Sequence, residues 1–163
     1  MFEAMARNAR ISLLLAVYDQ SFDRAAWHGT PLGRSLREIT WKQALKRPGR
    51  RRHNIWELVL HLAYWKSVAR RRLTRNSSIE FPRSPANFPA VPAKPTAALW
   101  RRDVALLKRE HQLLRAVISR FPESRLGQQG WHTRWTNAAT IYGIASHDLY
   151  HTGQIQLIRQ FVA

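Results

Sequence analysis

His147-Asp-Leu-Tyr-His151 is the stretch from which the fold of this sequence can be worked out. It lies within residues 137–161, whose apolar positions recur with helical spacing. Two histidines four positions apart stand one turn above the other on one helix face, where both imidazoles can chelate one ion. The same face carries further small or apolar residues, namely Gly143, Ile144, Ile155 and Ile158. We therefore expect both histidines to point into the core, where each needs a hydrogen-bond partner or a ligand.

Three more segments show helical periodicity, and together the four predict an all-α four-helix bundle. They are residues 7–26, residues 54–73 and a segment between Pro95 and Pro122. Asn54 and Glu57 have the spacing of a capping box, and Thr96 is the expected N-cap of the third helix. Residues 31–46 are expected to add one or two short helices, and no stretch alternates as a strand would.

Residues 76–95 hold five of the eight prolines, so this segment cannot be helical. It could be a linker between two domains or a long crossover inside one bundle. Two amphipathic helices on either side are too few to bury separate cores, which favours the crossover. We therefore predict a single helical domain over residues 1–163.

A third histidine, His61, is expected at the edge of the core on the second long helix. It is bordered by apolar residues, namely Leu58, Leu62, Trp65 and Ala69. A pair of histidines at this spacing is a weak signal, because buried histidines are usually satisfied by polar neighbours. A third inward histidine on another helix strengthens it. His61, His147 and His151 are predicted to bind a divalent transition metal, and imidazoles suit Zn, Ni, Fe or Cu better than Mg or Ca.

The two runs around these histidines resemble the DinB/YfiT-like family of bacterial four-helix proteins. The first run is Asn54-Ile-Trp-Glu-Leu-Val-Leu-His61-Leu-Ala-Tyr-Trp65, and the second is His147-Asp-Leu-Tyr-His151-Thr-Gly-Gln154-Ile155. The resemblance extends over nearly the whole chain, including Trp27-His28-Gly29 and the long crossover. It implies that His61, His147 and His151 are the metal ligands, with Zn or Ni as the metal, and that the protein is a homodimer. Characterised members of the family include thiol S-transferases and isomerases that use low-molecular-weight thiols, and a few hydrolases.

The predicted site is compatible with two reactions, metal-assisted hydrolysis and transfer of a thiol. A metal ion can lower the pKa of bound water to about 7, and it can also bind a thiolate and deliver it to an electrophile. Hydrolysis usually requires a general base. Glu57 lies one turn before His61, but its capping-box role is the preferred interpretation. Asp148 points away from the histidine face and could at most orient a histidine ring.

Tyr150 and Gln154 flank the histidine face and are further catalytic candidates, each with an equally good structural interpretation as a buried polar side chain. Gly143, one turn before His147, leaves space beside the ion or permits close helix packing. His28 is the first candidate for a fourth ligand. The remaining histidines, His53, His111 and His132, are mostly expected at the surface or at helix ends.

The chain is strongly basic, with 27 Lys and Arg against 10 Asp and Glu, a formal net charge of +17. Such a charge attracts polyanions. The basic residues are spread through the chain without a nucleic-acid-binding motif, so we do not expect nucleic acid as a partner. The sequence has no cysteine, which excludes disulfides and thiolate ligands and is compatible with a cytoplasmic location. No apolar run is long enough to cross a membrane.

Three functions remain as alternatives. The first is a metal-dependent enzyme that acts on a small molecule. The second is a non-catalytic structural protein whose ion connects two helices. The third is a basic protein that binds nucleic acid.

Overall fold

The computed structural model describes residues 9–162, and they form four long and three short helical elements without a β-strand. In chain order these are α2 (Ala9–Phe22), α3 (Leu32–Ser35), α4 (Trp41–Leu45), α5 (Ile55–Thr74), α6 (Ala97–Ser119), the 3-10 turn η1 (Glu123–Arg125) and α7 (Asn137–Val162). The predicted all-α class is confirmed.

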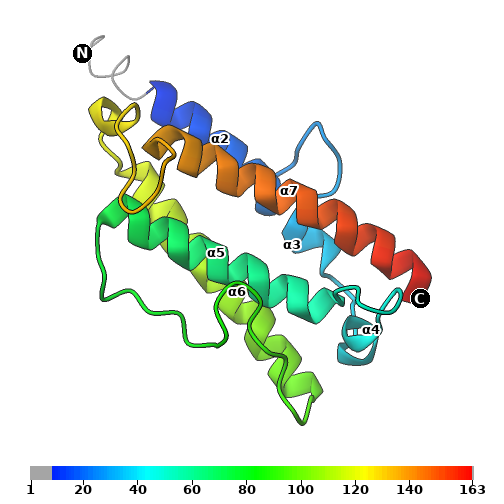
Figure 1. Ribbon diagram of the computed structural model, residues 1–163. Helices are drawn as coiled ribbons and strands as arrows, with labels where there is room; N and C mark the ends of the chain where they lie inside the picture. The colour runs from blue at the N-terminus through cyan, green and yellow to red at the C-terminus, as the bar shows by residue number, and fades with distance from the viewer. Residues whose placement is uncertain (1–8, 163) are drawn as a thin grey trace.

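The four long helices pack as a bundle (Figure 1). Helix α5 packs against α6 and α7, and α2 packs against the same two helices from the other side. The short helices α3 and α4 cover the end of the bundle at which α5 begins and α7 ends. No helix within residues 9–162 is both long and apolar enough to span a membrane.

The predicted helix starts are confirmed at α5 and α6. The Asn54 side chain accepts from the Glu57 N–H while the Glu57 carboxylate accepts from the Asn54 N–H, which is the predicted capping box. Thr96 caps α6 by accepting from the Leu99 N–H.

The first helix is shorter than predicted, because α2 ends at Phe22 rather than near residue 26. Its predicted start at residue 7 lies outside the described residues. The last hydrogen bonds of this helix end on the Asp19 carbonyl oxygen, which accepts from the N–H groups of both Asp23 and Arg24. The short helices α3 and α4 confirm the expectation for residues 31–46.

Residues 75–96 form the predicted crossover, which runs back along the outside of α5 before α6 begins (Figure 1). It is anchored to the bundle by Phe81, Phe88 and Val91, which pack against the apolar core. The proline-rich segment is therefore a part of the bundle, in contact with α5, and not a free tether.

Candidate metal centre

The three predicted ligands meet between α5 and α7. The Nε2 atom of His147 lies 3.0 Å from Nε2 of His61 and 3.1 Å from Nε2 of His151. His61 and His151 are buried, each with 6% of its surface exposed, and His147 is half-buried. The three residues each offer one nitrogen to a common point, with these atoms all within 4.8 Å of one another, so the group could hold a metal ion.

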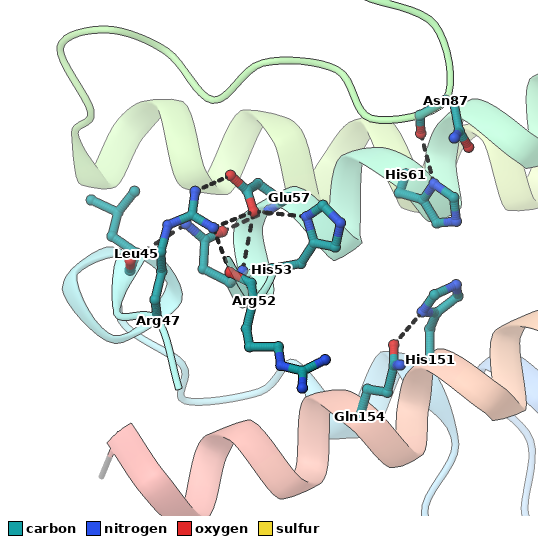
Figure 2. Close-up of polar contacts among 10 residues, drawn as sticks. Leu45, Arg47, Arg52, His53, Glu57, His61, Asn87, His151 and Gln154 are labelled. Carbon is teal, nitrogen blue, oxygen red and sulfur yellow. Dashed lines mark hydrogen bonds and ion pairs between the residues drawn. The ribbon is translucent and has the colours of Figure 1, made fainter. Parts of the chain in front are cut away.

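Two of the imidazoles are held by a hydrogen bond from their other nitrogen (Figure 2). Nδ1 of His61 lies 2.6 Å from the carbonyl oxygen of Asn87, and Nδ1 of His151 lies 2.6 Å from Oε1 of Gln154. An oxygen of either kind can only accept, so each Nδ1 carries the hydrogen and each Nε2 is left with a lone pair. This arrangement orients metal-ligating histidines in proteins generally.

The burial of the rings keeps them neutral at physiological pH. Burial lowers the pKa of His61 to about 4 and that of His147 to about 3, and it also lowers the pKa of His151. Nε2 of His147 carries at most one hydrogen, which it can donate to Nε2 of either His61 or His151. The nitrogen that does not receive this hydrogen then has no donor from His147. A cation would satisfy all three nitrogens together.

The spacing of the nitrogens also suits a metal ion. Ligand nitrogens at about 2.0–2.1 Å from zinc in tetrahedral geometry are about 3.3 Å apart, close to the 3.0 and 3.1 Å separations found here. The residues present therefore fit a divalent transition metal such as zinc or nickel.

The crossover supplies part of the site, which the sequence did not indicate. Asn87 accepts from His61 through its backbone oxygen and from Trp65 Nε1 through its side chain, at 2.9 Å. Its φ of 69° lies in the left-handed region, which asparagine tolerates better than most residues. The next residue, Phe88, stacks between the rings of His61 and His53, at 4.0 and 3.9 Å between ring centroids.

A cavity of about 520 Å³ adjoins the histidines. Its walls come from α5, the crossover, the loop before α7 and the first half of α7. They are formed by His61, Trp65, Ala69, Arg72, Asn87, Trp135, Ala139, Thr140, Tyr142, Gly143, Ile144 and His147. A Cβ atom built on Gly143 would meet no atom within 4 Å. The glycine thus leaves space beside the histidines, the first of its two predicted roles.

Glu57 lies in a separate polar cluster at the start of α5 (Figure 2). Its carboxylate accepts two hydrogen bonds from the Arg47 guanidinium and lies 3.1 Å from Nδ1 of His53. These contacts, with the capping box, lower the pKa of Glu57 against the raising effect of its burial. The carboxylate is therefore ionised and already paired.

The other predicted candidates are placed as follows. Gln154 reaches the site only through His151. Tyr150 packs the edge of its ring against His151, at 4.9 Å between centroids, and is 64% exposed. His28 is exposed in the turn after α2 and is not part of the metal-ligating group.

The Asp148 carboxylate forms no hydrogen bond to a histidine among the described residues. It forms an ion pair with Lys66, and both side chains are fully buried. Ser21 donates a further hydrogen bond to this carboxylate, at 3.3 Å. Asp148 therefore does not orient a histidine ring, the role considered for it, and instead forms an ion pair between two helices that no local pattern in the sequence indicated.

His111 is also buried, with 2% of its surface exposed, and not at the surface as expected for most of the remaining histidines. Its ring stacks between Tyr18 and Phe22, at 4.4 and 3.9 Å between centroids. Neither ring nitrogen has a hydrogen-bond partner among the described residues. The apolar spacing of α6 could have indicated this burial, because His111 lies one turn from the buried residues Leu107 and Leu114.

Comparison with known proteins gives a family for the chain. The family model of the DinB superfamily matches residues 24–155, a range that contains all three histidines and the crossover. No curated protein and no solved structure matches the chain. From its helical fold, its inward histidines and the extent of this match, the chain belongs to the DinB superfamily.

Proposed function

We propose that the protein is a metal-dependent enzyme that binds one Zn or Ni ion through His61, His147 and His151 and acts on a small molecule. The observation that carries this proposal is the position of the histidines in the wall of a cavity. His61 and His147 both line a space of about 520 Å³, within the size range of pockets that bury small ligands. An ion that served only to connect helices would not need this space.

Among the two predicted reactions we favour transfer of a low-molecular-weight thiol. No carboxylate is found among the described residues that line the cavity, and Glu57 and Asp148 are both held by cationic side chains. Hydrolysis would therefore lack a carboxylate base beside the substrate. Thiol transfer needs no such base, because a bound zinc or nickel ion stabilises the thiolate form of a thiol.

The chain's own residues would orient the ligands and exclude water. Asn87 and Gln154 hold His61 and His151 in the tautomer that presents Nε2. Trp65 and Ile144 give the cavity apolar walls. Tyr150, whose ring contacts His151, would act on the position of that ring, so we propose it and Gln154 as positioning residues.

Reaction of monochlorobimane with glutathione or cysteine tests the proposal. The thiol sulfur forms a bond to carbon, the carbon–chlorine bond breaks, chloride leaves and the thiol proton passes to solvent. The zinc- or nickel-loaded protein is expected to exceed the uncatalysed rate, and His147→Ala is expected to lose this excess. Arg109→Gln, a change at an exposed position on α6, is the control. A rate at background with both thiols and both metals would contradict thiol transfer.

A structural role of the ion is the second candidate, because the ligands come from two helices, with His61 on α5 and His147 on α7. In this case zinc would raise the melting temperature of the protein strongly and no thiol reaction would be accelerated. Measurements of the melting temperature and of the thiol reaction on the same protein preparations thus distinguish the two candidate functions.

We also propose that the protein forms a homodimer through α7. Large apolar side chains are exposed along one stripe of this helix, namely Tyr142, Tyr150, Leu157 and Phe161. Unpaired apolar stripes of this kind are common at protein interfaces. Leu157→Glu is expected to convert a dimer into a monomer in light-scattering measurements, and a monomeric wild-type protein would contradict the proposal.

A further inference from the structure

We propose that the cavity beside the histidines binds an organic anion with an apolar body, and that Arg72 binds its carboxylate or phosphate group. This inference rests on the proposed function, for which it names the class of electrophilic substrate. It is carried by the composition of the cavity and by the surroundings of Arg72.

The walls of the cavity suit an apolar body. Aromatic and aliphatic side chains make up most of its lining, among them Trp65, Trp135, Tyr142 and Ile144. Gly143 leaves open space on the side of α7, one turn before His147. A ligand placed here would therefore have its apolar part beside the histidines.

Arg72 is the one cationic side chain among the described residues that line this cavity. It lies in the last turn of α5 and is half-buried, with its guanidinium carbon 5.8 Å from the centre of the Trp65 ring. Within residues 9–162 it forms no ion pair. A half-buried guanidinium without a counter-ion is unfavourable, and an anion would remove this cost.

Arg70, two residues earlier on the same helix, differs from Arg72 in having an acidic partner. Its guanidinium forms hydrogen bonds of 3.0–3.3 Å to both carboxylate oxygens of Glu110 on α6. Arg70 is thereby committed to holding two helices together. Arg72 keeps its donors for a ligand.

A second hollow of about 290 Å³ shares Arg72 with the cavity. It is lined by Arg71, Arg72, Ser77, Trp131 and His132. Arg72 belongs to both spaces, and no acidic residue lines either of them within the described chain. The charge of this region is therefore complementary to an anionic group, with the apolar body extending toward His61 and His147.

Three probes with the same alkyl chain test the inference: octanoate, octyl phosphate and 1-octanol, titrated calorimetrically into metal-free and zinc-loaded protein. At least one of the two anions is expected to bind at least about tenfold more tightly than 1-octanol, because it forms a charge-assisted hydrogen bond with the guanidinium. The anion that binds more tightly identifies the preferred group.

Two variants make the assignment specific. Arg72→Gln is expected to remove the preference for the anion while the affinity for 1-octanol is kept, and Arg109→Gln, with the same change of charge at an exposed position, is expected to keep the preference. Gly143→Leu fills the open space beside the histidines and is expected to weaken all three probes without changing the metal content.

Equal affinities of the three probes for the wild-type protein, or equal effects of Arg72→Gln and Arg109→Gln, would overturn the inference. Its failure is distinguishable from failure of the proposed function, because the titrations of the metal-free protein measure binding of the probes without metal and without reaction. Accelerated transfer of thiol to monochlorobimane, together with equal affinities for the three probes, would leave the enzyme assignment in place and remove the anion site.

Discussion

Two buried polar clusters lie next to each other between α5 and α7, and they differ in how their charges and hydrogen bonds are satisfied. In the first, His61 and His147 present the same kind of atom to each other, 3.0 Å apart. In the second, Lys66 and Asp148 present opposite charges, and both side chains are fully buried. Asp148 directly follows His147 in the sequence, so one turn of α7 contributes to both.

The difference between the two clusters indicates which buried polar groups require a ligand. The Lys66–Asp148 pair carries its own counter-charge, because the ammonium faces the carboxylate and Ser21 donates to the same carboxylate oxygen, although the second oxygen of Asp148 has no partner among the described residues. The histidine cluster has three converging ring nitrogens, which a single hydrogen on His147 cannot satisfy together, and it adjoins a cavity. We infer that the first cluster holds the helices together and that the second exists to bind an ion.

The largest effect is expected where the ion pair of Lys66 and Asp148 is broken. Lys66→Met leaves the Asp148 carboxylate buried without a cation, and the loss of a partner from such a pair costs about 3–5 kcal/mol of unfolding free energy. Urea denaturation of the metal-free protein measures it. The double variant Lys66→Met, Asp148→Leu is expected to recover most of the stability, and a single variant within about 1 kcal/mol of wild type would refute the structural role of the pair.

A smaller effect is expected at the histidine cluster, and on metal affinity instead of stability. Gln154→Leu removes the acceptor that orients His151, so the affinity for zinc should fall about 10- to 100-fold. Competition with a chromogenic chelator measures this affinity. Gln160→Leu is the matched control, because Gln160 is exposed on the same helix. If both variants bind zinc as the wild type does, Gln154 does not support the site.

His111 is buried away from the metal ligands, so its contribution to the pH dependence of the unfolding free energy can be measured separately from theirs. Burial lowers its pKa to about 2 in the folded protein, whereas the unfolded chain takes up a proton below about pH 6.5. Stability from this residue is therefore complete above pH 6.5 and is lost as the pH falls, by about 2 kcal/mol at pH 5.

His111→Phe, which keeps the stacking between Tyr18 and Phe22, is expected to remove this part of the acid sensitivity in the metal-free protein. Denaturant titrations at pH 5 and pH 7 provide the measurement. An identical loss of stability on acidification in both proteins would show that His111 is solvated in the folded state.

The smallest effect is expected from the basic surface. Several arginines already pair with acidic side chains, as Arg70 does with Glu110 and Arg115 with Asp19, and the net charge of +17 should give only non-specific association with DNA. The expected Kd is about 10⁻⁴–10⁻⁶ M at physiological salt, rising steeply with salt and without displacement of the metal. Tight, sequence-selective binding in fluorescence anisotropy would revive the nucleic-acid alternative.

The sequence was sufficient for those features that depend on local spacing. The i, i+4 histidines, the Asn54 capping box and the Thr96 N-cap follow from helical geometry alone, and the structure has each of these where it was predicted. The end of α2 at Phe22 was missed, because the apolar pattern does not mark where the backbone leaves the helix.

The sequence was insufficient for contacts between segments that are far apart in the chain. Asn87 lies in a proline-rich segment without periodicity, and only the path of the crossover brings its carbonyl oxygen to His61. Lys66 and Asp148 are 82 positions apart, and each is an ordinary helical residue in its own segment. Such pairs depend on how the helices pack, which single-segment patterns do not encode.

Metal analysis of the protein purified without a histidine tag is the decisive test of the histidine site. Elemental analysis by mass spectrometry, after purification and again after incubation with zinc or nickel and desalting, gives the number of ions per chain. We predict one ion per wild-type chain and none in a folded His147→Ala variant. A wild-type protein that retains no ion after incubation, or a variant that retains as much as the wild type, would contradict the assignment of His61, His147 and His151 as a metal centre.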